Sequence, residues 1–147
     1  MAYGKDITLK IKSLNFPLGK YIVLGGASLA VRGIRETRDL DILITTELFE
    51  ELSHKGWAYD AVFEQKWNRK KLMRDDIEVY KDLYFEHLQK FIDAEEIINK
   101  ADIIDGVPFQ PLDHLLMGKI DTLREKDVKD IQLIKEYLKK QTGSNFI

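Results

Sequence analysis

Residues 24–42 read LGGASLAVRGIRETRDLDI, and this stretch places a diglycine and two aspartates a short distance apart along the chain. Just before the diglycine, Tyr21–Leu24 (YIVL) is short, β-branched and aromatic, which predicts a buried strand. Residues 28–32 predict the first turns of a short helix. Residues 39–44 (DLDILI) then turn fully apolar, which predicts a second strand that enters the core.

The two aspartates are expected to share one face of the second strand. Residues two apart in a strand point to the same side, so Asp39 and Asp41 project together. Paired carboxylates repel each other unless solvent or a divalent cation offsets their charge, and hard oxygen ligands suit Mg²⁺. Gly25 and Gly26 lack side chains, so backbone N–H groups can approach phosphate oxygens there, and the Ser28 hydroxyl can add a contact. Magnesium beside a phosphate cradle indicates phosphoryl or nucleotidyl transfer.

Each feature also has a plainer interpretation when it is taken alone. A diglycine is typical of an ordinary turn from a strand to a helix. The aspartates are equally compatible with a solvated strand end at which Arg35 and Arg38 act as counter-ions. The functional interpretation depends on the joint occurrence of the two features at their particular spacing.

That spacing resembles the nucleotidyltransferase superfamily built on the DNA polymerase β-like palm. The signature of the superfamily is an apolar residue, Gly, then Gly or Ser, about a dozen residues, and Asp-apolar-acidic-apolar. Here Leu24-Gly25-Gly26 is followed by twelve residues and then Asp39-Leu40-Asp41-Ile42. The family also carries a third carboxylate between apolar neighbours on a later strand. Glu78 in Ile77-Glu78-Val79 matches, with Glu in place of the usual Asp, and Asp82 is the alternative.

Residues 112–134 (LDHLLMGKIDTLREKDVKDIQLI) resemble the lysine-bearing helices of small bacterial nucleotidyltransferases, including toxin members of toxin–antitoxin pairs. By that resemblance a lysine contacts the triphosphate and an acid lies near the site. The helical period independently places Lys119 within an apolar arc, so its ammonium must extend to the rim or meet an anion. The arc is formed by Leu115, Leu116, Ile120 and Leu123, and the other candidates by resemblance are Arg124, Lys126 and Asp127.

The resemblance implies Mg²⁺-dependent transfer of a nucleoside monophosphate from a nucleoside triphosphate to a hydroxyl acceptor. A small molecule, a protein side chain and an RNA 3′ end all stay open as acceptors. The expected catalytic and metal-binding residues, for one or two Mg²⁺ ions, are Asp39, Asp41 and Glu78. The expected nucleotide-binding residues are Gly25, Gly26, Ser28, Arg38, Lys119, Lys126 and Asp127. The alternative is a non-catalytic member of the fold that binds a nucleotide or a protein partner, such as a toxin–antitoxin component.

Composition bounds the fold class and the partners. The chain has 147 residues, of which 44% are hydrophobic, so one α/β (α+β) domain is expected over 1–147, with a small mixed sheet backed by helices. Its core is expected over about 20–110 and a C-terminal helical part over about 112–140. A nucleotidyltransferase fold follows from the resemblance.

Charge and residue types set further expectations. The absence of cysteine removes disulfides and thiolate zinc sites, and together with the lack of a signal-peptide pattern it favours a cytoplasmic location. No apolar segment reaches the roughly 20 residues of a membrane span. A net charge of −2 argues against extended binding of DNA.

The remaining elements are predicted from local patterns. We expect a helix over 47–55 with Thr46 as its N-cap, extended structure over 57–74, a strand over 77–80 and a helix near 86–92. Asp105-Gly106 predicts a hairpin, and helices follow over 113–124 and 128–140. A basic and aromatic stretch is either a solvated edge strand or a surface for a polyanionic acceptor. It contains Lys66, Trp67, Arg69, Lys70, Lys71 and Arg74, while His54, His87 and His114 lack the spacing of metal ligands.

Overall fold

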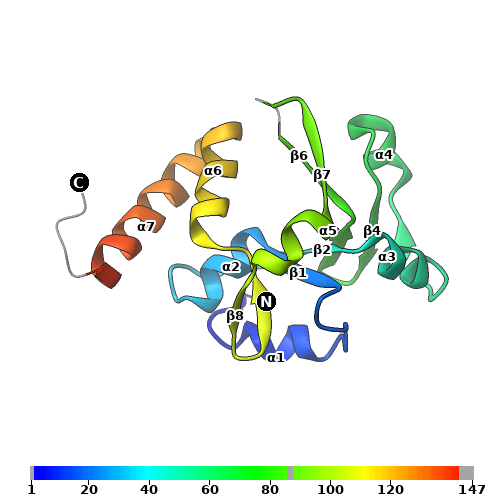
Figure 1. The fold of residues 1–147 in the computed structure, drawn as a ribbon, viewed down its shortest axis with the longest axis horizontal. Helices are drawn as coiled ribbons and strands as arrows, with labels where there is room; N and C mark the ends of the chain where they lie inside the picture. The colour runs from blue at the N-terminus through cyan, green and yellow to red at the C-terminus, as the bar shows by residue number, and fades with distance from the viewer. Residues whose placement is uncertain (1, 86–87, 143–147) are drawn as a thin grey trace.

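A computed structural model describes residues 2–85 and 88–142, and it is an α+β arrangement of a mixed sheet with helices around it (Figure 1). The helices are α1 (Ile7–Lys12), α2 (Gly25–Val31), α3 (Thr46–Ser53), α4 (Ala61–Trp67), α5 (Ala94–Ile97), α6 (Leu112–Thr122) and α7 (Glu125–Thr142), with a 3₁₀ turn η1 (Ile98–Lys100). The strands are β1 (Tyr21–Leu24), β2 (Leu40–Ile44), β3 (Ala58–Tyr59), β4 (Lys71–Arg74), β5 (Ile77–Tyr80), β6 (Asp82–Phe85), β7 (Lys90–Asp93), β8 (Asp102–Ile104) and β9 (Val107–Phe109).

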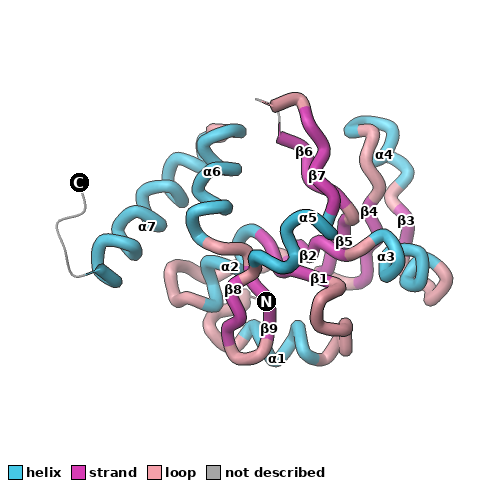
Figure 2. The backbone as a smooth tube through the Cα atoms, viewed as in Figure 1, coloured by secondary structure: helices cyan, strands magenta, loops and turns pink. Residues whose placement is uncertain are grey.

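Within the described residues, seven strands form one sheet in the order β3-β4-β5-β2-β1-β9-β8 (Figure 2). The β2 strand is central, antiparallel to β1 and parallel to β5. In this register Asp41 lies between Leu24 on β1 and Glu78 on β5. The sheet therefore places the end of β1, the start of β2 and the middle of β5 side by side.

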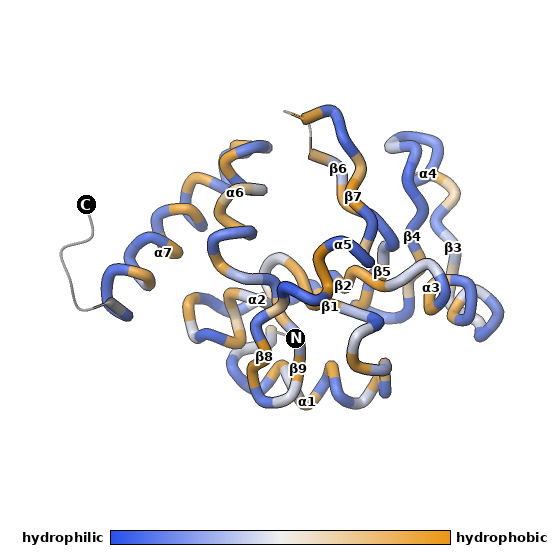
Figure 3. Tube along the Cα trace, viewed as in Figure 1, coloured by the Kyte–Doolittle hydropathy of each residue, from blue (hydrophilic) through white to orange (hydrophobic). Residues whose placement is uncertain are grey.

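Apolar residues fill both faces of the central strands. All four residues of β1 are buried, as expected for the YIVL run. One face packs on α1, α2 and α3, while Ile22 and Leu43 on the other face pack against Ala94 and Ile97 of α5. Figure 3 shows hydrophobic colour along β1 and β2 and alternating colour along α6 and α7. Two-sided burial explains why these strands read as continuous apolar runs.

A third apolar cluster joins the C-terminal helices to the first motif. Leu29 of α2 is fully buried against Leu112 and Leu115 of α6 and Ile134 of α7. The α6–α7 pair therefore docks beside α2, on the opposite side of the sheet's centre from α4 (Figure 1). This docking brings the loop between α6 and α7 next to the diglycine.

Two regional predictions are wrong. The helix expected near 86–92 is instead the β6–β7 hairpin, whose register pairs Tyr84 with Phe91, while residues 86 and 87, including His87, lie outside the described residues. The cross-strand aromatic pair overrides the helix propensity of the local residues, since the rings lie 4.8 Å apart. The extended structure expected over 57–74 is present in β3 and β4, but the prediction is wrong for α4, which forms because the Asp60 carboxylate caps that helix by accepting from the N–H of Phe63.

Other expectations stand with small shifts. The N-cap of α3 is Thr45 rather than Thr46, and its hydroxyl accepts from the N–H of Leu48 at 3.2 Å. The β8–β9 hairpin turns at Asp105 and Gly106, which both have positive φ, as a two-residue turn of this kind requires. Asp39 stands one residue before β2 instead of inside it. No helix in the described part of the chain is long and apolar enough to span a membrane.

Candidate functional site

A pocket of about 410 Å³ lies where the diglycine, the segment leading into β2 and the C-terminal helices meet. Two acidic residues of the first motif and several cations line it. The lining residues are Ala2, Gly25, Gly26, Arg35, Glu36, Thr37, Arg38, Asp39, Asp41, Lys119, Arg124, Lys126 and Asp130. The structure thus brings most of the expected site residues into one cavity, although Gly25 and Lys126 lie 101 positions apart in the sequence.

The turn at the start of α2 requires glycine for two separate reasons. Gly25 has φ +60°, which side-chain-bearing residues rarely adopt, and its N–H donates to Oε1 of Gln110 at 3.1 Å. A Cβ on Gly26 would lie only 2.5 Å from Oγ1 of Thr37. The Thr37 hydroxyl in turn lies 3.3 Å from the N–H and from the carbonyl of Asp39. The close approach at Gly26 therefore fixes the segment that carries the first aspartate.

Asp41 is the most perturbed acid of the pocket. Burial first, and then the charges of Glu78 and Asp39, raise the pKa of Asp41 to about 7. Burial also opposes ionisation of Glu78, but hydrogen bonds from the Tyr80 hydroxyl at 2.8 Å and the Lys71 ammonium at 3.1 Å outweigh it and lower the pKa of Glu78. Near neutral pH the proton of this pair therefore resides on Asp41.

Four acids line the pocket, Glu36, Asp39, Asp41 and Asp130, and the last of them is already paired with Arg35 and Lys119. Among the described residues, no group of three or more His, Cys, Asp or Glu side chains is arranged to hold a metal ion. Glu78 does not line the pocket and is held by Lys71 and Tyr80. Asp82, the alternative third acid, is paired with Arg69 at 2.9 Å. Asp39 and Asp41 still suit a hard divalent cation, because an added positive charge would offset the burial and the neighbouring negative charges that raise the pKa of Asp41.

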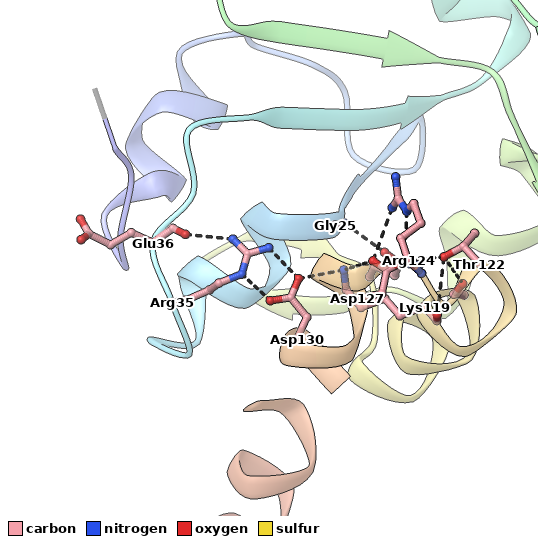
Figure 4. A network of polar contacts seen from close by, with 10 residues as sticks. Gly25, Arg35, Glu36, Lys119, Thr122, Arg124, Asp127 and Asp130 are labelled. Carbon is pink, nitrogen blue, oxygen red and sulfur yellow. Dashed lines mark hydrogen bonds and ion pairs between the residues drawn. The ribbon is translucent and has the colours of Figure 1, made fainter. Parts of the chain in front are cut away.

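Lys119 meets anions supplied by the protein itself. Its side chain is 12% exposed, and its ammonium lies 3.0 Å from Asp130 and 3.4 Å from Asp127 (Figure 4). The expected apolar arc is only partly right, since Leu115 is buried while Ile120 and Leu123 are half exposed or more. The anions that Lys119 meets are therefore carboxylates of α7, and its contact with a triphosphate stays a prediction.

Two acids of α7 hold the cations of the pocket in place. Asp130 accepts from Arg35 Nε at 2.7 Å and Nη2 at 2.8 Å, a bidentate contact that connects α7 to the segment before β2 (Figure 4). Asp127 is fully buried and accepts from Thr122 Oγ1 and from the backbone and side chain of Arg124. Burial opposes the charge of each acid, yet these hydrogen bonds keep both pKa values below the usual range.

Several expected or missed residues have specific places. The phosphate contact expected of Ser28 is wrong, because its side chain is fully buried. Its hydroxyl donates to the carbonyl of Gln110 at 2.7 Å and accepts from Arg32 at 2.6 Å. Asp127 does not line the pocket, but it holds Lys119 and Arg124, which do. Arg38 and Lys126 line the pocket directly. Sequence reasoning missed Gln110 and Asp130. Of these two residues, only Asp130 could have been predicted from the sequence, since it lies about one helical turn after Asp127 on the same helix face.

No family model, no curated protein and no solved structure matches this chain. The resemblance to nucleotidyltransferases therefore depends on the two sequence motifs themselves.

Proposed function

We propose that this protein is a Mg²⁺-dependent nucleotidyltransferase, which transfers a nucleoside monophosphate from a nucleoside triphosphate to a hydroxyl acceptor. One observation carries the proposal. The two motif aspartates and the diglycine line the same pocket as Lys119, Arg124 and Lys126, which come from the far end of the chain. Acidic ligands for a divalent cation beside several cations for a polyphosphate are the two requirements of this chemistry.

The size and the charge distribution of the pocket support a triphosphate. A volume of about 410 Å³ falls within the range of roughly 300–1,000 Å³ that is typical of small-molecule sites. Asp39 and Asp41 would hold Mg²⁺, which when bound offsets negative charge on the triphosphate. Lys126 and Arg124 lie at the α6–α7 end of the pocket, where they are suited to bind the phosphates that leave.

The transfer balances with groups that the chain and water provide. The acceptor oxygen forms a bond to the α-phosphorus, and the bond from that phosphorus to the oxygen bridging to the β-phosphate breaks, which releases pyrophosphate. The acceptor proton passes to water, because Asp39 and Asp41 would hold the cation and Glu78 is held outside the pocket by Lys71 and Tyr80. The neighbouring cations stabilise the charge on the departing pyrophosphate.

A labelling experiment tests the proposal. The protein is incubated with Mg²⁺, each α-³²P-labelled nucleoside triphosphate and a panel of acceptors: polyols, the protein itself and oligonucleotides with a free 3′-hydroxyl. We expect label transfer and pyrophosphate release with at least one combination of a triphosphate and an acceptor. The double variant Asp39→Asn/Asp41→Asn should lose both, while Glu50→Gln, an exposed acid on α3, should keep them.

Two outcomes contradict the proposal. The first is transfer by the double variant at the wild-type rate, which would exclude the aspartates from the chemistry. The second is binding of Mg²⁺-triphosphate with no transfer to any acceptor, which would indicate a nucleotide-binding protein without catalysis.

A further inference from the structure

A second, larger pocket of about 650 Å³ lies between α4, the β6–β7 hairpin and the loop after α6. The hairpin stands between α4 and α6 in Figure 1. We call this pocket the aromatic groove and define it by Phe63, Lys66, Trp67, Arg69, Tyr84 and Phe91. None of the chemistry proposed above uses these six side chains.

The groove presents aromatic rings to its interior and to solvent. Trp67 is 53% exposed, Phe91 42% and Tyr84 40%, although large aromatic side chains are generally well buried. Tyr84 and Phe91 form a cross-strand pair with ring centroids 4.8 Å apart. Three exposed aromatic rings in one concave surface indicate a binding site for planar groups.

Cations lie against these rings. The Lys66 ammonium is 5.2 Å from the centre of the Trp67 ring, and the Arg69 guanidinium is 5.7 Å from that of Phe63. Arg69 is also paired with Asp82 at 2.9 Å, so part of its charge is already offset. Planar faces interleaved with a small number of positive charges match unpaired bases joined by phosphodiesters, which combine both chemistries in one polymer.

The aromatic groove adjoins the candidate site at Arg124. Arg124 lines both pockets, and Thr122, which lines the groove, donates to the Asp127 carboxylate that also holds Arg124. A strand that lies in the groove would thus end beside the cations of the first pocket. The net charge of −2 limits such binding to a few nucleotides, because the chain has no wider positive field.

We infer that the aromatic groove binds the last few nucleotides of a single-stranded nucleic acid and directs its terminal hydroxyl into the first pocket. The inference rests on the proposed function for the reaction at that hydroxyl. Binding of the strand itself depends only on the groove. The terminal hydroxyl of this strand would be the acceptor that the chemistry of the first pocket leaves open.

The test measures binding of short 5′-labelled oligonucleotides, RNA and DNA of the same sequence, by fluorescence anisotropy without any triphosphate. We expect saturable binding of at least one of them, and loss of one stacking contact in Trp67→Ala should weaken that binding about 5- to 150-fold. Lys66→Glu, an exposed change on α4, should weaken it as well. The three cations that line the groove should contribute a slope of about −2 to the plot of the logarithm of affinity against the logarithm of salt concentration, at about 0.7 each.

Matched controls carry the same chemical changes elsewhere. Tyr59→Ala removes a comparably exposed aromatic from β3, and Lys135→Glu reverses an exposed charge on α7, so both should bind like wild type. Tryptophan emission gives a second readout. Trp57 is buried, so quenching by an unlabelled oligonucleotide should be lost in Trp67→Phe, even though phenylalanine keeps a stacking ring.

Three results would overturn the inference: no binding of either oligonucleotide by the wild type, equal losses in the controls, or displacement by polyglutamate as effective as displacement by unlabelled oligonucleotide. The last result would show that the groove recognises charge alone. Failure of the two proposals can be told apart. Groove-dependent binding without label transfer keeps the groove and removes the transfer reaction, whereas transfer that Trp67→Ala and Lys66→Glu leave unchanged keeps the reaction and removes the groove.

Discussion

At the scale of single residues, Asp41 carries the sharpest electrostatic conflict in the candidate site. It is held between Leu24 and Glu78 by the register of the sheet, and a Cβ on Gly25 would lie 3.8 Å from its Oδ2. Burial and two neighbouring acids raise its pKa to about 7. The residue is therefore costly to ionise in the protein alone, and a bound cation would offset that cost.

Asp41→Asn should stabilise the ligand-free protein at alkaline pH. A carboxyl whose folded-state pKa is raised binds its proton more readily when folded than when unfolded, so the wild type loses stability as pH rises from about 4 to about 7. Asparagine removes that loss, and we expect a gain of the order of 4 kcal/mol at pH 8, at about 1.4 kcal/mol for each pKa unit. Urea unfolding at pH 5 and pH 8 measures it. A gain that is equal at both pH values would contradict the assigned cause.

Gly26→Ala should lower the free energy of unfolding by about 1–3 kcal/mol, since the added methyl overlaps the hydroxyl of Thr37. The clash also displaces the support of the Asp39 backbone. Thr37→Ala in the same chain should recover part of the loss, which a double-mutant cycle would detect. As a control, Gly118→Ala on α6 faces open space and should instead stabilise by about 0.5–1 kcal/mol. Additive effects of Gly26→Ala and Thr37→Ala would show that the contact is not limiting.

At the scale of elements, α7 positions the cations of the pocket through its first two turns. Asp127 and Asp130 stand on one helix face and hold Arg124, Lys119 and Arg35. The bidentate contact of Asp130 with Arg35 joins residues 95 positions apart. Orientation of the phosphate-binding side chains therefore depends on how α7 docks.

Asp130→Asn should loosen this docking. The substitution keeps the shape of the side chain but removes the charge that two cations share, so we expect a loss of about 1–3 kcal/mol in the free energy of unfolding. Amide hydrogen exchange should become faster in α7 and around Arg35. Glu136→Gln, an exposed acid on the same helix, should change stability by less than about 0.5 kcal/mol. Unchanged exchange in Asp130→Asn would show that apolar packing alone docks α7.

Lys119→Met should weaken both stability and triphosphate binding. Methionine keeps the apolar stem, but Asp127 and Asp130 lose one partner each while retaining Arg124 and Arg35, so the expected stability loss is moderate, about 1–2 kcal/mol. Triphosphate affinity should fall by about 1.5–3 kcal/mol. The shift in Tm caused by Mg²⁺-triphosphate should shrink accordingly, and Lys119→Arg should preserve most of it. An undiminished shift in Lys119→Met would remove this lysine from the site.

The elements that the sequence predicts are those whose signal is local. The YIVL strand, the Asp105-Gly106 hairpin and the C-terminal helices each follow from period or turn chemistry. The β6–β7 hairpin is not predicted, because its residues favour a helix locally. Only the cross-strand pairing of Tyr84 with Phe91 favours the hairpin over that helix. The role of Ser28 is mispredicted for a related reason, since its burial depends on a contact with the distant residue Gln110.

At the scale of the whole molecule, one cluster of apolar side chains assembles the candidate site. Leu29, Leu112, Leu115 and Ile134 pack α2 against α6 and α7, which sets the cationic loop beside the acidic strand. Sequence motifs name most residues of each half, but they do not state that Asp130 reaches Arg35 or that Gln110 holds the turn at Gly25. Those contacts follow from tertiary packing and from no local period.

The most direct test of the proposed site is calorimetric titration of the protein with nucleoside triphosphates, with Mg²⁺ and with excess chelator. We expect saturable binding of at least one triphosphate in Mg²⁺, loss of that binding in chelator, and the same loss in Asp39→Asn/Asp41→Asn even though the double variant stays folded. Binding with equal affinity in wild type and double variant, or with and without Mg²⁺, would contradict the claim that this pocket is a metal-dependent triphosphate site.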